Sequence, residues 1–310
     1  MTKVELAVAE MRSGFDLKSL MALLAVGFPL LSLLIVVLAN ASTMTTATRI
    51  SCQNNQHEIW TAVQVFEARK QRYPSWRTEL ADRQVAWPVL LMPYLGMHEY
   101  YDVWATKGSQ PTMLKISMYV CPNDEQETKD GPWLSYVVNC GVPDALTGDK
   151  LVETPAHGLF FDGVVTDKNP KPIITNASEV QKKDGLAHTL GLGENLRVLG
   201  WTGYAPGTET VQEYLVGFNW QHYAKPPAEH WLQYPVNQRD DEKELLTRMS
   251  TNSNAARLNS RHGNTVNVTF ADGHWIALFD QIDEQVYNKL CTPDGKALNQ
   301  LPLAKTEYVK

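Results

Sequence analysis

The longest apolar stretch of the chain lies near its N-terminus and predicts a membrane-spanning helix. Residues 20–38 contain no charged side chain. At about 1.5 Å of rise per residue, a helix of this length covers roughly 28 Å, which nearly matches the hydrocarbon core of a bilayer. Gly27, Pro29 and Ser32 interrupt the run. Because the carbonyls freed there need partners in lipid, we expect a kink or a neighbouring helix. The transmembrane helix is assigned to residues 15–44.

The charges around this run predict its orientation. Three basic residues precede it and only Arg49 follows it closely. Since basic residues favour the cytoplasmic side of a span, residues 1–14 are expected in the cytoplasm and the C-terminal bulk in the periplasm or outside the cell. A secretory signal peptide is the alternative, because Ala39 to Ala41 has the A-x-A form of a cleavage site. The apolar run exceeds the about 7–15 residues of a signal-peptide core, which favours a retained helix.

An amphipathic pattern follows the apolar run. Ile59, Val63 and Phe66 recur at i, i+4 and i+7, with Trp60 beside them, and polar residues occupy the other positions. This spacing places the apolar side chains on one face of a helix. Residues 45–75 are therefore predicted to continue the membrane helix outside the cytoplasm and to pack their apolar face on the head of the protein.

The head, residues 76–310, alternates short apolar stretches with turns. The stretches PVLLMPYL, MLKISMYVC, WLSYVVNCG, GLFFDG and EYLVGFNW are typical of short strands, and recurring Asp-Gly pairs are typical of turns. The segment 222–257 is polar and contains prolines, so we expect an exposed loop with a short helix at 241–249. The predicted fold class is α+β, with a long N-terminal helix packed on an antiparallel sheet and a loop-rich head.

The stretch 258–280 predicts a β-hairpin. Apolar and polar residues alternate on both sides of Asp272-Gly273, so this pair is expected to form a two-residue turn. His262 precedes the first strand and, at about 3.3 Å per residue, lies far from the turn. Chemistry shared between His262 and Asp272 is therefore not expected. We predict that His262 and Arg261 take part in a capping or hydrogen-bond network, with a ligand-binding role for His262 as the alternative.

Charge and motifs narrow the function class. The formal net charge is −6 and no basic block occurs, so a nucleic-acid partner is not expected. No G-x-S-x-G motif or complete zinc-peptidase motif is present, which makes an enzyme the weakest class, and we expect no catalytic residue. The sequence GLGENL lacks the later glycine of a nucleotide-binding loop, and its Glu194 is expected to end a strand in a hydrogen-bonded turn.

The four cysteines are Cys52, Cys121, Cys140 and Cys291. In a head outside the cytoplasm they favour disulfides over thiols, and two bridges are expected. Three pairings remain open, among which a short Cys121–Cys140 loop would join two predicted turns. Zinc is the competing hypothesis, but the sequence has no C-x2-C pair.

The residues before the apolar run resemble a second pattern. The stretch MRSGFDLKSLMALLAV resembles the type IV prepilin signature, which a peptidase cleaves between Gly and Phe, here Gly14 and Phe15. The resemblance implies a pilin-like or pseudopilin-like plan, in which the fifth mature residue is a Glu that pairs with a neighbouring subunit. This chain has Ser19 at that position. An uncleaved single-span anchor is the alternative.

Short motifs occur in a fixed order along the chain, namely CQNN from Cys52, LLMPYL, CPND, SYVVNCG, KDGLAHTLGLGEN, SRHGNTVNVTFADGHW and VYNKLCTPDGK. This ordered series resembles the pilin-like family known as domain of unknown function 1559. The series covers nearly the whole chain, and its C-terminal hallmark is a His, nine residues and Asp-Gly. The resemblance implies an N-terminal membrane helix and an α+β head outside the cytoplasm, without a known activity. The residues that match the family motifs are Cys52, Asn54, Asn55, Cys121, Pro122, Asp124, Cys140, Asp184, Gly185, Glu194, Arg261, His262, Asp272 and Gly273.

Two ligand hypotheses accompany this resemblance. Pseudopilins of similar plan hold Ca²⁺ in a C-terminal loop, and Asp283 and Asp294 would supply hard oxygen ligands, although ordinary turns explain both residues as well. Trp201, Trp220 and Trp231 flank the irregular region and are candidates for stacking on sugar rings, with core packing as the alternative.

The sequence therefore predicts a membrane-anchored pilin-like or pseudopilin-like structural subunit of a secretion-like or pilus-like assembly. Its expected partners are membrane lipid and, through the N-terminal helix, itself or other pilin-like subunits. The alternative function is a tethered surface module that binds an extracellular polysaccharide or other polymer through residues 201–257.

Overall fold

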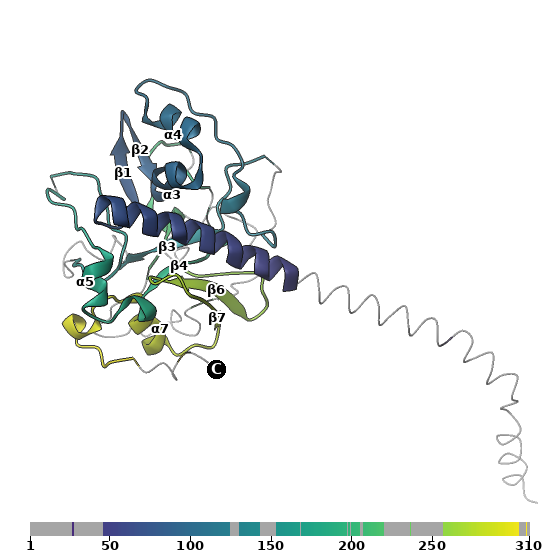
Figure 1. The fold of residues 1–310 in the computed structure, drawn as a ribbon, viewed down its shortest axis with the longest axis vertical. Helices are drawn as coiled ribbons and strands as arrows, with labels where there is room; N and C mark the ends of the chain where they lie inside the picture. The colour runs from purple at the N-terminus through teal and green to yellow at the C-terminus, as the bar shows by residue number, and fades with distance from the viewer. Residues whose placement is uncertain are drawn as a thin grey trace, which may run out of the picture. The chain divides into compact units, whose positions relative to one another are not determined.

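The structure has a long helix at residues 46–70, which confirms the predicted amphipathic helix. In this computed structural model, Ile59, Trp60 and Val63 lie on one face of the helix and are fully buried, while the opposite face is exposed. Figure 1 shows this helix, in dark blue, lying across the sheet that forms the centre of the head. Its burial follows from the i, i+4 spacing, because one stripe of the helix supplies nearly all of its contacts with the sheet.

The structure describes residues 46–124, 130–142, 153–167, 169–196, 198, 200–204, 207–219 and 257–303, together with residues 27, 236 and 308. The predicted leader and, except for Gly27, the predicted membrane helix fall outside this part of the chain. Gly14, Phe15, Trp220, Trp231 and the predicted helix at 241–249 do so as well. Within the described part, no helix combines the length and the apolar composition that crossing a bilayer requires.

The central sheet has five strands in the order β5-β3-β4-β6-β7. Three of its four pairings are antiparallel, as predicted, but β3 and β5 run parallel. The long connection from β3 to β5 makes this possible, since a parallel pair needs a crossover rather than a tight turn. A separate two-stranded sheet pairs β1 with β2. The strands are β1 (Arg77–Leu80), β2 (Arg83–Ala86), β3 (Tyr136–Gly141), β4 (Leu190–Glu194), β5 (Gly217–Asn219), β6 (Thr265–Phe270) and β7 (Trp275–Phe279).

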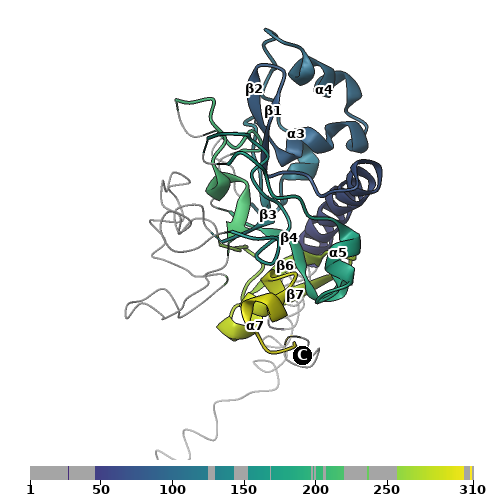
Figure 2. The same ribbon diagram turned by 90° about the vertical axis from the view of Figure 1, so that its left-hand side faces the viewer.

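Short helices lie at both ends of this sheet. In Figures 1 and 2, α3 and α4 lie with β1 and β2 at one end, and α7 lies at the other. The α-helices are α3 (Trp87–Leu91), α4 (His98–Ala105), α5 (Ala177–Gln181) and α7 (Glu284–Cys291), and the 3-10 helices are η1 (Met92–Leu95), η2 (Ser117–Tyr119), η4 (Leu186–His188), η5 (Glu213–Leu215) and η7 (Gly295–Leu298).

The stretch PVLLMPYL was expected to be a strand, and this prediction was wrong. It forms α3 and η1, with Pro88 in the first turn of α3 and Pro93 in the first turn of η1. A short apolar run does not distinguish a strand from a buried helix by its periodicity. Proline fits the first turn of a helix because the amide hydrogen it lacks has no partner there.

The hairpin of β6 and β7 forms, but its turn is longer than predicted. The amide of Phe270 donates to the His274 carbonyl at 2.8 Å, and the amide of Gly273 donates to the Phe270 carbonyl at 2.9 Å. Three residues therefore connect the strands instead of two. Gly273 has φ +96°, which matches a three-residue loop closed by a residue with positive φ.

Strand β6 is buried on both faces. Although polar and apolar residues alternate along it, Thr265, Asn267 and Thr269 are as buried as the apolar residues between them. The amide groups of Gln53 and Gln56 from the helix meet this polar face, and Thr269 Oγ1 donates to Gln56 Oε1 at 2.9 Å. The polar side chains of β6 are therefore satisfied by the helix and not by water.

Gly191 in β4 supports the ring of Trp60, and its replacement by alanine tests this packing. A Cβ at Gly191 would overlap the six-membered part of the Trp60 indole. We expect Gly191→Ala to lower the free energy of unfolding by about 1–3 kcal/mol, as overpacking commonly does. Urea unfolding followed by fluorescence measures this loss.

The matched control is the same substitution in a Trp60→Phe background. Phenylalanine has no second ring to overlap the new methyl group, so Gly191→Ala should cost less there than in the natural chain. Equal costs in the two backgrounds would contradict the contact.

Candidate functional site: a buried cluster at the disulfide

Four side chains from distant parts of the sequence meet under the long helix. Cys52 lies on that helix, Cys121 follows η2, Glu194 ends β4 and His262 precedes β6. All four are buried, with exposed fractions of 5% or less. Each offers a sulfur, nitrogen or oxygen donor atom, and these donors lie within 4.8 Å of one another. We call these four residues the helix–sheet cluster.

His262 joins the disulfide to the carboxylate. Its Nε2 lies 3.1 Å from Glu194 Oε1 and 3.4 Å from Cys121 Sγ. The carboxylate accepts, so Nε2 carries the proton in this arrangement. His262 therefore takes part in a hydrogen-bond network, as predicted, and its partners there are Glu194 and Cys121 rather than Asp272.

Glu194 has three donors around it. The amide of Asn267 donates to Oε2 at 2.9 Å, Asn267 Nδ2 donates to Oε1 at 3.1 Å, and His262 donates to the same oxygen. The sequence correctly placed Glu194 at the end of a strand, but it did not indicate that its side chain is fully buried. A buried carboxylate needs several donors to offset its lost hydration.

The backbone around His262 is fixed as well. Its amide donates to Ser260 Oγ at 3.1 Å, and its carbonyl accepts from Arg49 Nη2 at 3.0 Å and from Thr265 Oγ1 at 3.0 Å. Arg49 belongs to the long helix, so its hydrogen bond to the His262 carbonyl connects this helix to the segment just before β6. Arg261 contributes its carbonyl, which accepts from Asn123 Nδ2 at 2.9 Å.

Tyr136 and Asn55 extend the cluster along β3. Asn55 Nδ2 donates to the Val120 carbonyl at 3.0 Å and lies 3.3 Å from the Tyr136 hydroxyl oxygen. Burial raises the pKa of Tyr136 well above its usual value, and the negative charge of Glu194 raises it further. Tyr136 therefore stays neutral at physiological pH.

The turn that carries Cys121 is itself anchored. Asp124 is buried, its amide donates to the Cys121 carbonyl at 2.9 Å, and its Oδ2 accepts from Ser135 Oγ at 2.6 Å. Pro122 and Asn54 are exposed at the edge of the cluster. The structure thus brings together the family-motif residues Cys52, Asn55, Cys121, Asp124, Glu194, Arg261 and His262.

The disulfide joins Cys52 to Cys121, with their Cα atoms 5.1 Å apart. Two bridges were expected, and this prediction was wrong, because the structure has one; among the pairings left open, Cys52 is the partner of Cys121. Cys140 lies inside β3 rather than in a turn, and its sulfur packs where a side chain on Gly217 would stand. Cys291 ends α7, and burial raises the pKa of its thiol. Both remain buried thiols.

The two calcium candidates do not share a site. Asp283 caps the N-terminus of α7, where it accepts from the amides of Gln285 and Val286, and Asp294 follows the other end of α7 and caps η7. Their side-chain oxygens are thus occupied at opposite ends of one helix.

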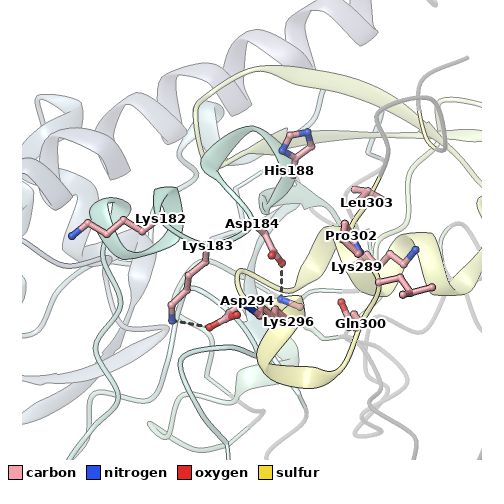
Figure 3. A pocket seen from close by; sticks show the side chains of 12 residues that line it. Lys182, Lys183, Asp184, His188, Lys289, Asp294, Lys296, Gln300, Pro302 and Leu303 are labelled. Carbon is pink, nitrogen blue, oxygen red and sulfur yellow. Dashed lines mark hydrogen bonds and ion pairs between the residues drawn. The ribbon is translucent and has the colours of Figure 1, made fainter.

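Asp294 borders a pocket of about 660 Å³ together with Asp184 and four lysines. Figure 3 shows that Lys183 turns to Asp294, at 3.1 Å, while Lys182 and Lys289 extend in different directions. Asp184 accepts from the amide of Gly295 at 2.6 Å, and burial raises its pKa. Lys182, Lys183 and Lys289 therefore do not converge on one point of this pocket.

The remaining candidates lie apart from the cluster. Trp201 is fully buried, its Nε1 donates to the Leu114 carbonyl at 2.8 Å, and it packs against Trp104, so it offers no face to a sugar. Gly185 has φ +91° in the turn before η4. Asp272 Oδ1 accepts from the His274 amide at 3.0 Å in the hairpin turn.

The comparison with protein families agrees with this set of residues. A family model described as "Protein of unknown function (DUF1559)" matches residues 45–285. The chain belongs to this family. The DUF1559 match begins at the start of the described helix and includes all four residues of the helix–sheet cluster, which confirms the resemblance found in the sequence motifs. No curated protein and no solved structure matches the chain.

The DUF1559 motifs include all four members of the cluster, without showing that they meet. Gln53, Gln56 and Asn267 were missed altogether. A signal was present, because polar residues on alternate positions of β6 face a helix whose i, i+3 positions Gln53 and Gln56 are also polar. Matching polar stripes on two elements indicate a buried hydrogen-bonded seam.

Proposed function

We propose that this DUF1559 protein is a membrane-anchored, pilin-like structural subunit in which the helix at residues 46–70 connects an N-terminal membrane segment to the head. The observation that supports it is the attachment of this helix to the sheet. Apolar packing at Trp60, a disulfide at Cys52 and hydrogen bonds at Gln53 and Gln56 all join it to the head. The helix begins eight residues after the uncharged run at 20–38 ends.

The chemistry of the cluster favours a structural role over catalysis. All four residues are closed to solvent, so a substrate does not reach the imidazole or the carboxylate in this conformation. Disulfides persist in the periplasm and outside the cell. A head placed there by a membrane stem would keep this bond.

Charged substitutions in the uncharged run test the anchor. Leu34→Lys combined with Ile35→Lys places two charges near the centre of the span, where each lysine costs about 2.5–3.5 kcal/mol on insertion scales. We expect the double variant of the full chain to leave the membrane fraction or to fail to insert. Alkaline extraction of membranes followed by immunoblotting measures this.

The matched control is Leu34→Ala with Ile35→Ala, which keeps the run apolar and should remain in membranes. Lysine variants that stay in membranes at the natural level would contradict the anchor. The N-terminal mass of the native protein separates the remaining alternatives: a start at Phe15 supports pilin-type processing, Met1 an uncleaved anchor and Ser42 a secreted protein. Electron microscopy of cells with and without the gene tests for a filament.

A further inference from the structure

We propose that the helix–sheet cluster is a redox-dependent Zn²⁺ site, in which the reduced chain holds zinc where the oxidised chain has its disulfide. Cys52 and Cys121 would supply thiolates, His262 Nε2 a nitrogen and Glu194 Oε1 an oxygen. This role goes beyond the structural function proposed above and concerns the same side chains in another oxidation state.

The donor set fits zinc in kind and number. Structural zinc sites are tetrahedral, with ligand distances of about 2.3 Å to sulfur and about 2.0–2.2 Å to nitrogen or oxygen. The four donors already lie within 4.8 Å of one another. Once the sulfur–sulfur bond is broken, the two sulfurs separate by rotation of their side chains, and the other two donors move little. Sequence spacing did not reveal this set, because each ligand comes from a different segment.

The surroundings would hold the ligands in place. Asn267 donates to both oxygens of Glu194, and the segment around His262 is fixed through Ser260, Thr265 and Arg49. Hydrogen-bonded partners of this kind orient metal ligands and strengthen binding. Two thiolates and one carboxylate would leave the zinc complex with one negative charge. The Arg49 guanidinium, which donates to the backbone carbonyl of His262, would partly offset this charge.

The chemical steps balance. A dithiol reductant transfers two electrons and two protons to the Cys52–Cys121 bond and becomes a disulfide itself. Zn²⁺ then displaces the two thiol protons into solvent, and the imidazole proton moves from Nε2 to Nδ1 so that Nε2 offers a lone pair. In the reverse direction a disulfide oxidant takes two electrons from the thiolates, the Cys52–Cys121 bond forms and Zn²⁺ is released. The long helix is therefore cross-linked to the segment that carries Cys121 in both states.

The test uses the full chain, produced with reduced thiols and purified anaerobically in detergent. Co²⁺ is the probe, since tetrahedral Co²⁺ bound to thiolate has intense visible bands and a near-ultraviolet charge-transfer band. We expect one equivalent of Co²⁺ to produce both, Zn²⁺ to displace it, and the air-oxidised chain to show neither. Zn²⁺ should also raise the unfolding midpoint of the reduced chain, since it binds the folded form.

Variants separate this site from the other two thiols. Cys140→Ala with Cys291→Ala should keep the bands, whereas Cys52→Ser with Cys121→Ser should lose them. Glu194→Gln keeps the size of the side chain but replaces the anionic ligand by a weak one, and we expect Co²⁺ affinity to fall at least about tenfold. Circular dichroism confirms that each variant is folded.

Three results would overturn the proposal. These are a reduced natural chain without charge-transfer bands, bands that persist without Cys52 and Cys121, and a Glu194→Gln variant that is folded and binds Co²⁺ with unchanged affinity. Membrane extraction does not depend on any of these readouts, so failure here leaves the proposed anchor function to its own test.

Discussion

Replacing Cys52 by alanine is expected to lower the free energy of unfolding by about 4 kcal/mol, because the bond to Cys121 closes a long loop. The two cysteines are 69 residues apart in the sequence. In the chain-entropy account, a loop of that length removes about 4 kcal/mol of conformational freedom from the unfolded state. Urea unfolding of the full oxidised chain measures the loss, and the slope of the transition should rise as the unfolded chain expands.

The companion variants are Cys121→Ala and the double substitution. Once the bond is absent, the second cysteine contributes only its packing, so all three variants should unfold at nearly the same urea concentration. Single losses that add up in the double variant, or singles that cost less than about 1 kcal/mol, would show that the bond does not brace the helix. Reduction of the natural chain should reproduce the single-variant result when zinc is removed by a chelator.

The parts of the fold that could be predicted from the sequence were those whose pattern lies within a short stretch of neighbouring residues. The helix at residues 46–70 followed from the spacing of Ile59, Val63 and Phe66, because a helix repeats every 3.6 residues and each position reports on its neighbours. The hairpin followed from alternation around Asp272-Gly273. Even there, the sequence placed the turn but not its length, which depends on whether Phe270 and His274 pair across it.

The parts that failed depend on distant partners. PVLLMPYL is as apolar as a buried strand, and its helical form becomes clear only from Pro88 and Pro93 at first-turn positions. The parallel pairing of β3 with β5 joins segments that are separated in the sequence by residues 142–216. The parallel pairing has no local signature, because it is decided by what each segment packs against.

The candidate site shows the same division. The family motifs identified Cys52, Cys121, Glu194 and His262 as separate residues, and disulfide pairing stayed open because spacing does not measure distance in space. What the structure adds is their convergence and the polar seam of Gln53, Gln56 and Asn267 that surrounds them. Because of this convergence, the separate motifs form one connection between the helix at residues 46–70 and the rest of the head.

Removal of the buried carboxylate is expected to be as damaging as loss of the disulfide. Glu194→Ala would leave the amide and the Nδ2 group of Asn267 without their acceptor and would strand His262 Nε2 in a buried space. Each buried donor left without its acceptor typically costs about 1–3 kcal/mol, so the loss of one acceptor group by these donors reaches roughly the 4 kcal/mol expected for the disulfide. We expect a loss of this size in urea unfolding of the full chain.

Two substitutions calibrate this result. Glu194→Gln keeps one oxygen for Asn267 and should cost less than Glu194→Ala, about 1–3 kcal/mol. Gln64→Ala removes an exposed hydrogen bond of 3.2 Å from the helix at residues 46–70 to the Asp272 carbonyl in the hairpin turn. This substitution should change the free energy of unfolding by less than about 0.5 kcal/mol.

A double-variant cycle then isolates the His262–Glu194 contact. Because the two side chains share one hydrogen bond and no exposed surface, His262→Ala should cost less in the Glu194→Ala background than in the natural chain, with a coupling of about 0.5–3 kcal/mol. If the two losses add without coupling, or if Glu194→Ala is as mild as Gln64→Ala, the imidazole and the carboxylate do not act as a pair. The attachment of the long helix to the head would be unaffected by that outcome, because it rests on the disulfide, on Trp60 and on the hydrogen bonds of Gln53 and Gln56.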